Sequence, residues 1–287
     1  MHKITAIIPV HNWDKVSDNI KYLINLKDIN KFKIIFILDS CPSYAENDLK
    51  ELLFLIKNIN FIILNRNYNS ASESRNEGLS LVDTEWVCFW DSDDLPNLNG
   101  FYNLYTSVSS ENVDLVVGQI RTAYIRNGLE IKSRTTKTSS HLTLALDLGF
   151  TRILYKSLFI KELFFSKYKI GEDILFLAEI ICKKPSIIFS QALVYNYSNS
   201  NWIIHKTDTK LVCKLLQLYS RLVEAKSMQK DELIKGFYLL VTFKVLIGIL
   251  KRVIFKNLQL SFTVVMYLIK LFTIKNLYCL SKLLIKS

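Results

Sequence analysis

The sequence has 287 residues, half of them hydrophobic, and a formal net charge of +11. Eight Gly and four Pro argue against a low-complexity chain, and five scattered Cys without a CxxC pair argue against a disulfide framework or a zinc site. The length suffices for one catalytic domain plus an appendage. The apolar stretch near the N-terminus is too short for a signal peptide, so we expect a cytoplasmic protein.

The positive charge is concentrated near the C-terminus. Residues 233–287 contain eight Lys, one Arg and no acid, which accounts for nine of the eleven net charges. These cations lie among large apolar residues, a mixture that fits an anionic membrane surface better than nucleic acid. The longest uncharged run there, 257–269, is too short to span a bilayer. We expect 206–287 to form a basic, hydrophobic helical extension at the inner face of the cell membrane; a helical bundle or a dimer seam is the alternative.

The first ninety residues alternate between apolar strands and amphipathic helices. We expect strands over 4–9, 33–38, 61–64 and 86–90. Helices are expected around 16–24, 49–56 and 74–81. This order indicates an α/β fold with a mostly parallel, Rossmann-like sheet and helices on both faces. Further strands are expected over 115–119, 122–125, 152–155 and 193–197. From 208 onward the pattern is helical.

Acidic residues follow these strands at the carboxyl edge of the sheet, where ligands bind in such folds. Asp91 and Asp93 stand two residues apart directly after an apolar strand. Two ionised carboxylates so close would repel each other, and a divalent cation such as Mn²⁺ or Mg²⁺ removes that conflict and can bridge to a diphosphate. The alternative is an ordinary acidic turn that caps a helix at Pro96.

A second acidic pair, Glu172 and Asp173, precedes an apolar helix. Taken alone, the pair is most simply interpreted as a helix N-cap. A carboxylate in such a place can also accept the proton of an attacking hydroxyl group. Asp173 could therefore serve both as a cap and as a general base.

Together these segments resemble a known family. The stretches ITAIIPVHN at 4–12, SRNEGL at 74–79, FWDSDD at 89–94 and GED at 171–173, with Asp39 between the first two, occur in the order and spacing of family 2 glycosyltransferases with the GT-A fold. The segment from 154 to 173 is similar to the bacterial branch that assembles surface polysaccharides. The resemblance implies a catalytic domain over 1–205, with a nucleotide-binding half at 1–96 and an acceptor half at 97–205.

The resemblance also implies a donor site. The expected donor is a nucleotide diphosphate sugar, with UDP as the expected nucleotide. Pro9, His11 and Asp39 would lie against its base and ribose, and Arg75 would lie close to the nucleotide. Asp91 would contact the ribose or the metal.

The metal and acceptor sites are implied in the same way. Asp93, together with Asp91, would ligate Mn²⁺ or Mg²⁺, and His205 is a further candidate ligand. Asp173 would be the general base of an inverting hexosyltransferase, and Glu172 would support it or touch the acceptor. The acceptor would be a glycan or a lipid-linked molecule in bacterial surface polysaccharide synthesis, with no nucleic-acid partner.

The chain departs from the family pattern at three places. His11 stands where an aromatic residue is usual, and 38–41 lacks one carboxylate of the usual Asp-Asp-Gly-Ser. The Gln-x-x-Arg-Trp motif of processive synthases is absent, which favours a single-transfer enzyme. The alternatives are a sugar nucleotidyltransferase, although 11–14 lacks the Gly-rich loop expected there, and a catalytically inactive, membrane-associated binding module.

Overall fold

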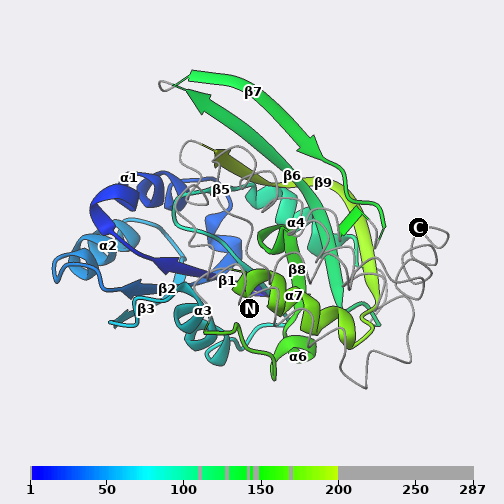
Figure 1. Cartoon of the computed structure of the whole chain (residues 1–287). Helices are drawn as coiled ribbons and strands as arrows, with labels where there is room; N and C mark the ends of the chain where they lie inside the picture. Colours follow the sequence, from blue (N-terminus) through cyan, green and yellow to red (C-terminus); the bar gives the residue numbers. More distant parts are fainter. Residues whose placement is uncertain are drawn as a thin grey trace, which may run out of the picture. The chain divides into compact units, whose positions relative to one another are not determined.

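Figure 1 shows a computed structural model of the protein, which describes residues 2–108, 112–126, 129–140, 143–144, 149–167 and 171–199. Met1–Thr138 and Gly149–Asn201 form one compact unit, which contains every element named below. The predicted extension at 206–287 and His205 lie outside the described residues, and the predicted domain boundaries stay predictions. No helix within the described ranges is long and apolar enough to cross a membrane.

The N-terminal half is a parallel β/α arrangement. Its elements are β1 (Ile4–Val10), α1 (Trp13–Ile24), a 3₁₀ turn η1 (Ile29–Lys31), β2 (Phe32–Asp39), α2 (Ala45–Phe54), β3 (Asn60–Arg66), α3 (Ala71–Ser80) and β4 (Trp86–Phe89). Strands β1, β2 and β4 are buried along their whole length, as expected for apolar runs covered on both faces. The strands predicted over 4–9, 33–38, 61–64 and 86–90 are confirmed to within two residues at each end.

The second half extends the same sheet with both antiparallel and parallel pairs. Its elements are β5 (Leu95–Pro96), α4 (Leu98–Thr106), β6 (Leu115–Arg126), β7 (Leu129–Thr136), η2 (Phe150–Arg152), β8 (Ile153–Lys156), α6 (Ser157–Ile160), α7 (Glu172–Cys182) and β9 (Ile187–Asn199). The strand order is β3-β2-β1-β4-β8-β6-β9-β5, and β7 pairs with β6. In Figure 1 the β6–β7 hairpin extends beyond the rest of the sheet.

Helices cover both faces of the sheet, as predicted. Alternate β1 residues, including Ile8, join one core cluster with apolar residues of α1, α2 and α4. Ile7 points to the opposite face, where it packs against Gly78 of α3. Its register partner on β4 is Phe89, whose ring lies 5.8 Å from that of Phe176 on α7. The predicted α/β fold with helices on both faces is therefore confirmed.

Three details differ from the sequence-based expectations. The two strands expected over 115–119 and 122–125 form the single strand β6, which is long because it pairs with both β7 and β9. Strand β7 was not predicted, since its side chains are mostly exposed and polar. Helix α4 begins at Leu98 and is capped by the Asn97 side chain, which accepts the N–H of Gly100, so the alternative of an acidic turn that caps a helix at Pro96 is wrong.

Candidate active site

The turn between β4 and β5 carries the two predicted metal-binding carboxylates. It begins where the buried strand β4 ends, and the N–H of Asp94 donates to the carbonyl oxygen of Asp91 at 3.2 Å. Asp91 is half-buried and Asp93 is exposed. Partial desolvation in the turn and the negative charge of Asp91 raise the pKa of Asp93. The turn thus presents one carboxylate to solvent beside a second that is partly enclosed.

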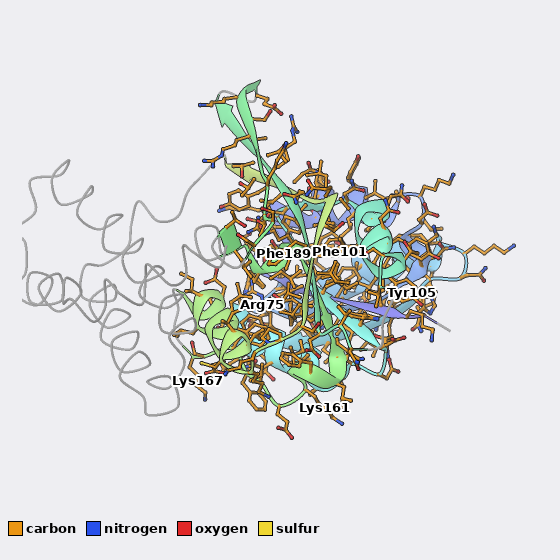
Figure 2. The ribbon with its side chains drawn as sticks, turned by 90° about the vertical axis from the view of Figure 1, so that its right-hand side faces the viewer. Arg75, Phe101, Tyr105, Lys161, Lys167 and Phe189 are labelled. Carbon is orange, nitrogen blue, oxygen red and sulfur yellow. The ribbon has the colours of Figure 1, made fainter. Side chains whose placement is uncertain are left out.

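The partly enclosed carboxylate is held by Arg75 of α3. The Nη2 atom of Arg75 lies 2.7 Å from Oδ1 of Asp91, and its Nη1 atom lies 3.4 Å from Oε1 of Glu172. The guanidinium also stacks on an aromatic ring, with its central carbon 4.7 Å from the ring centroid of Phe150. Only 5% of Arg75 is exposed. Figure 2 shows Arg75 among the packed side chains, whereas Lys167 lies at the edge of the described part.

These two ion pairs keep Arg75 charged despite its burial. Burial alone would lower its pKa, but the negative charges of Asp91 and Glu172 raise the pKa of Arg75 instead. Asp91 follows β4 in the predicted nucleotide-binding half, whereas Glu172 begins α7 in the predicted acceptor half. One guanidinium therefore connects acidic groups from both halves of the sheet.

The start of α7 positions Glu172 and Asp173. The N-cap is Gly171, with φ of 78°, and no side chain caps this helix. The prediction that Asp173 is the N-cap is therefore wrong, because Asp173 lies one residue inside the first turn. Burial raises the pKa of Asp173 to about 6, and the charge of Glu172 acts in the same direction, against the Ile174 N–H and Arg75. Asp173 is thus a stronger base than an ordinary aspartate but still mostly ionised at pH 7.

Residues next to Arg75 on α3 connect the helix to two other segments. The Ser74 hydroxyl donates to the Asp39 carboxylate at 3.2 Å. The Asn76 amide makes two bonds with the backbone of Phe165, donating to its carbonyl at 2.9 Å and accepting its N–H at 2.7 Å. The ring of Phe165 in turn stacks on Phe176 of α7 at a centroid distance of 4.0 Å. Helix α3 is therefore linked to α7 as well as to the sheet.

Two further residues of this α3 motif, Glu77 and Gly78, anchor the helix to β3 and β1. The Glu77 carboxylate accepts from Nε of Arg66 at 2.8 Å and from the Tyr68 hydroxyl at 3.1 Å. Gly78 lies so close to β1 that a Cβ there would stand 2.5 Å from Cγ2 of Ile7. Most residues of the segment SRNEGL thus fix α3 against its neighbours, while Arg75 pairs with the acidic residues.

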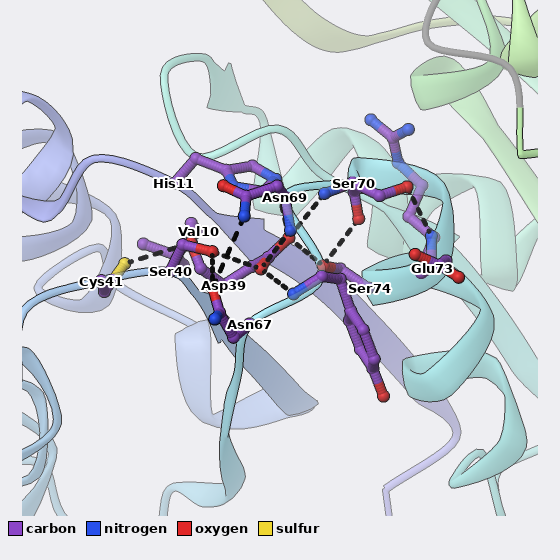
Figure 3. Close-up of polar contacts among 12 residues, drawn as sticks. Val10, His11, Asp39, Ser40, Cys41, Asn67, Asn69, Ser70, Glu73 and Ser74 are labelled. Carbon is purple, nitrogen blue, oxygen red and sulfur yellow. Dashed lines mark hydrogen bonds and ion pairs between the residues drawn. The ribbon is translucent and has the colours of Figure 1, made fainter.

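Asp39 forms a second polar cluster, at the end of β2 (Figure 3). Its carboxylate has no exposed surface and accepts hydrogen bonds at 2.7 to 3.2 Å from the N–H groups of Tyr68, Asn69 and Ser70 and from the Ser74 and Ser40 hydroxyls. Burial opposes ionisation, but the Ser70 and Asn69 N–H bonds and the nearby His11 outweigh it and lower the pKa of Asp39. Asp39 therefore shapes the loop in front of α3, and its contact with a nucleotide stays a prediction.

His11 is the accessible member of this cluster. Its Nε2 atom lies 3.5 Å from Oδ2 of Asp39, and 39% of its side chain is exposed. Pro9 is buried inside β1, paired with Ile37 of β2. Any ligand that approaches this end of the sheet meets His11 before it meets Asp39.

The structure therefore arranges the predicted residues in two groups joined by α3. One group contains Arg75, Asp91 and Glu172, and the charges of all three act on Asp173. The other contains Asp39 and His11. Two residues that hold the 91–94 turn, Asn19 and Tyr195, were missed by the sequence analysis; they carry no local signal, since their partners are more than 70 positions away. Asn76 was missed although it belongs to the quoted SRNEGL motif.

The chemistry of the turn fits a cation brought in with a diphosphate. Among the described residues, no cluster of three or more His, Cys, Asp or Glu side chains could hold a metal by itself. Asp91 and Asp93 supply two hard oxygen ligands, and Mg²⁺ in particular often uses only one or two carboxylates together with substrate phosphates. A protein-only metal cage is therefore not what these residues form.

Comparison with known proteins identifies the family. The sequence profile described as Glycosyl transferase family 2 matches residues 5–171, which is more than half of the chain. The chain belongs to this family. The predicted family membership is therefore confirmed; the match covers the acids at 91–94 and the β/α half, and it ends directly before Glu172 and Asp173.

Two curated bacterial proteins are similar over part of their length. The poly(ribitol-phosphate) beta-N-acetylglucosaminyltransferase TarP of Staphylococcus aureus is 32% identical over 126 residues, which is 42% of this chain and 37% of TarP. Glycosyltransferase GlyG of Streptococcus pneumoniae is 22% identical over 116 residues, which is 40% of this chain and 38% of GlyG. The chain therefore matches little more than a third of these relatives, which agree with the predicted bacterial branch.

Solved structures share the fold. S. aureus TarS 1–349 in complex with UDP-GlcNAc matches with a TM-score of 0.64 and 17% identity, over 83% of this chain and 71% of that one. The mannosyltransferase PcManGT of Pyrobaculum calidifontis, in complex with GDP-Man and Mn²⁺, matches with a TM-score of 0.58 and 11% identity, over 96% of this chain and 83% of that one. These likenesses confirm the predicted GT-A fold.

Proposed function

We propose that the protein is an inverting glycosyltransferase that moves a sugar from a UDP-sugar to a hydroxyl group of a glycan or lipid-linked acceptor in bacterial surface polysaccharide synthesis. The observation that carries the proposal is the Arg75 guanidinium, which joins Asp91 to Glu172 beside Asp173. The positive charge of Arg75 acts both on Asp91, which we assign to the donor side, and on Asp173, which we assign to proton transfer.

Asp173 is the general base in this proposal. Its carboxylate accepts the proton of the acceptor hydroxyl while the hydroxyl oxygen forms a bond to the anomeric carbon, and the bond from that carbon to the diphosphate oxygen breaks. UDP leaves with the electron pair of that bond. A pKa of about 6 suits this role, because the carboxylate is mostly ionised at pH 7 and is still more basic than an exposed aspartate.

Asp93 and Asp91 would hold Mn²⁺ or Mg²⁺ at the donor diphosphate. Such a cation neutralises the charge that develops on the departing UDP. Asp93 is the more available ligand, since Asp91 already pairs with Arg75 at 2.7 Å. Arg75 keeps the second carboxylate in place and limits its repulsion of Asp93.

The relatives suggest which donor and acceptor to test first. TarP is named for transfer of N-acetylglucosamine to poly(ribitol-phosphate), and the TarS structure contains UDP-GlcNAc. UDP-GlcNAc is therefore the first donor to try, and a polyol-phosphate polymer is the first acceptor. A lipid-linked acceptor would be met at the membrane, to which we assign the basic residues 233–287.

Release of UDP tests the proposal. The protein is incubated with Mn²⁺ and a panel of nucleotide sugars, with and without polyol-phosphate and lipid-linked acceptors, and free nucleoside diphosphate is measured. A glycosyltransferase releases UDP and forms a glycosylated acceptor. In a parallel incubation with UTP and a sugar 1-phosphate, release of inorganic pyrophosphate would instead indicate a nucleotidyltransferase, and binding without turnover of any donor would indicate an inactive binding module.

Asp173→Asn and Glu179→Gln provide a matched pair for that assay. Both residues lie on α7, but Glu179 is exposed, with Lys183 as the charge acting on it. UDP release should be lost in Asp173→Asn and kept in Glu179→Gln. Equal activity in the two variants would contradict the role of Asp173.

A further inference from the structure

The backbone of the 91–94 turn is held by side chains from two distant elements. On α1, the Nδ2 atom of Asn19 donates to the carbonyl oxygens of Ser92 and Asp94, both at 2.9 Å. On β9, the hydroxyl oxygen of Tyr195 accepts the N–H of Asp91 at 2.9 Å. Together with the Asp94 N–H bond to the Asp91 carbonyl, four bonds fix the backbone of the turn.

Both N–H hydrogens of the Asn19 side chain bind the turn. A side-chain amide has two N–H hydrogens, and the two bonds to the turn use both of them. Asparagine is also a weaker helix former than the residues that commonly fill the middle of a helix such as α1. The position therefore carries a residue suited to bridging two carbonyl groups rather than to stabilising the helix itself.

Tyr195 is equally well placed. Its side chain is completely buried, and its register partner is Pro96 of β5, the strand that directly follows the turn. Burial and the nearby carboxylates of Asp91 and Asp94 raise the pKa of Tyr195 well above its ordinary value, so the hydroxyl stays neutral. The Tyr195 hydroxyl thus binds the first residue of the turn, while Asn19 binds its second and last residues.

We propose that Asn19 and Tyr195 are positioning residues, which hold the 91–94 turn in the conformation that presents the Asp91 and Asp93 carboxylates to the donor diphosphate and its cation. This inference rests on the proposed function. Neither residue needs to touch the donor, because both act through the backbone of the turn. Partners that orient metal-binding groups typically account for roughly 10- to 100-fold in metal affinity or activity.

A purely structural role for Asn19 would give a different result, and α1 contains a matched control. Asn25 ends the same helix, and its Nδ2 atom donates to the Lys21 carbonyl at 2.8 Å, at an exposed position away from the turn. Asn25→Ala removes a side-chain to backbone bond from α1 without touching the turn. Asn19→Ala removes the two bonds to the turn, and Asn19→Asp places a carboxylate against the same two carbonyl oxygens.

The first measurement is made without ligand. Hydrogen–deuterium exchange of the full chain is followed in peptides that cover residues 90–96. Asn19→Ala and Tyr195→Phe should speed exchange in these peptides, because the Asp91 and Asp94 N–H groups lose their fixed geometry. Asn25→Ala should leave it unchanged. Unchanged exchange in both Asn19→Ala and Tyr195→Phe would overturn the inference whatever the protein's activity.

The second measurement is calorimetric binding of UDP in the presence of Mn²⁺. Asn19→Ala should weaken binding by roughly 10- to 100-fold, with a larger loss in Asn19→Asp, while Asn25→Ala should leave binding unchanged. Tyr195→Phe, which keeps the ring, should shift binding in the same direction. Wild-type affinity in both Asn19→Ala and Tyr195→Phe would refute the positioning role. Failure of the wild-type chain to bind UDP at all would refute the proposed function, while the exchange data would still decide whether these residues hold the turn.

Discussion

Arg75 reaches Asp91 across the end of the sheet and pairs with it at 2.7 Å, with only 6% of the arginine side chain exposed. The partner carboxylate is therefore neutralised by the chain itself before any ligand binds. The neighbouring Asp93 has no such pair among the described residues. The two carboxylates of one short motif thus have different surroundings, since Asp91 is paired with α3 and Asp93 is not.

Replacing the buried Arg75 should lower the stability of the fold. In Arg75→Gln, Asp91 and Glu172 lose their shared partner, and breaking a buried ion pair typically costs about 3 kcal/mol. Urea denaturation measures this loss. Arg66→Gln is the control, because 37% of the Arg66 side chain is exposed where it pairs with Glu77, so this variant should lose much less stability than Arg75→Gln. Equal losses in the two variants would show that the buried site has no special stability.

Asp93→Asn should abolish Mn²⁺-dependent donor binding and leave the fold intact, because the side chain is exposed. Thermal stabilisation by UDP-sugar, with and without Mn²⁺, checks this, since a ligand that binds only the folded state raises the melting temperature. The control is Asp18→Asn, an aspartate on α1 that is 94% exposed. An Asp93→Asn protein with wild-type stabilisation and turnover would rule out this residue as a metal ligand.

Asp173→Asn should lower kcat by about 10²-fold or more and change donor affinity little, as expected for a general base. In the wild-type protein, kcat should fall as the pH drops through about 6, because Asp173 becomes protonated. Glu172→Gln removes a charge that raises this pKa, so the acid limb should move to lower pH. Rate profiles from pH 4.5 to 8 measure both effects. An acid limb that stays in place in Glu172→Gln would contradict the assigned coupling.

Asp39→Asn should destabilise the protein by about 2–3 kcal/mol, because an amide cannot accept all the bonds of the carboxylate and bonds to charged groups are worth about 1.5–3 kcal/mol. The folded pKa of Asp39 is lowered, so its contribution is present above the ordinary aspartate pKa and is lost as the pH falls through the folded pKa. Urea denaturation at pH 7 and at pH 3 measures this difference, which should shrink at pH 3. Ser74→Ala, which removes one of these bonds, should cost less than Asp39→Asn.

Residues 233–287 should bind vesicles rich in anionic lipid. Each Lys or Arg near such a surface contributes about 1 kcal/mol, and salt screens the attraction. The full chain should sediment with the vesicles and be partly released by high salt, whereas a chain that ends near Asp231 should stay unbound. Aggregation of the shortened chain, together with failure of the full chain to bind vesicles, would favour a bundle or dimer seam and leave the proposed catalysis untouched.

Strands β1, β2 and β4 could be predicted because they are continuous apolar runs, which are buried on both faces. The 91–94 acids could be located for the same reason, since they directly follow such a run. Strand β7 could not be predicted, because its polar side chains are mostly solvent-exposed and show no buried face. The Asn19 and Tyr195 contacts could not be predicted either, since they join residues 73 to 104 positions apart and depend on the finished fold.

Arg75 shows how a residue can be identified before its partners are known. Its place in the SRNEGL segment marked it as functional, but the sequence placed it near a nucleotide. The structure pairs it with Asp91 and Glu172, because α3 lies against the same face of the sheet as the start of α7, and its closeness to a nucleotide stays a prediction. The local sequence pattern thus identifies Arg75, whereas the packing of α3 and α7 determines which carboxylates it pairs with.

The missing side chain at Gly78 has a consequence for the whole site. Even one methyl group there would press against Ile7, so α3 would have to rise or tilt away from β1. Arg75 sits almost one turn earlier on this helix, and Asn76 and Ser74 flank it. The positions of three polar side chains therefore depend on a contact between Gly78 and Ile7 that leaves no room for a methyl group.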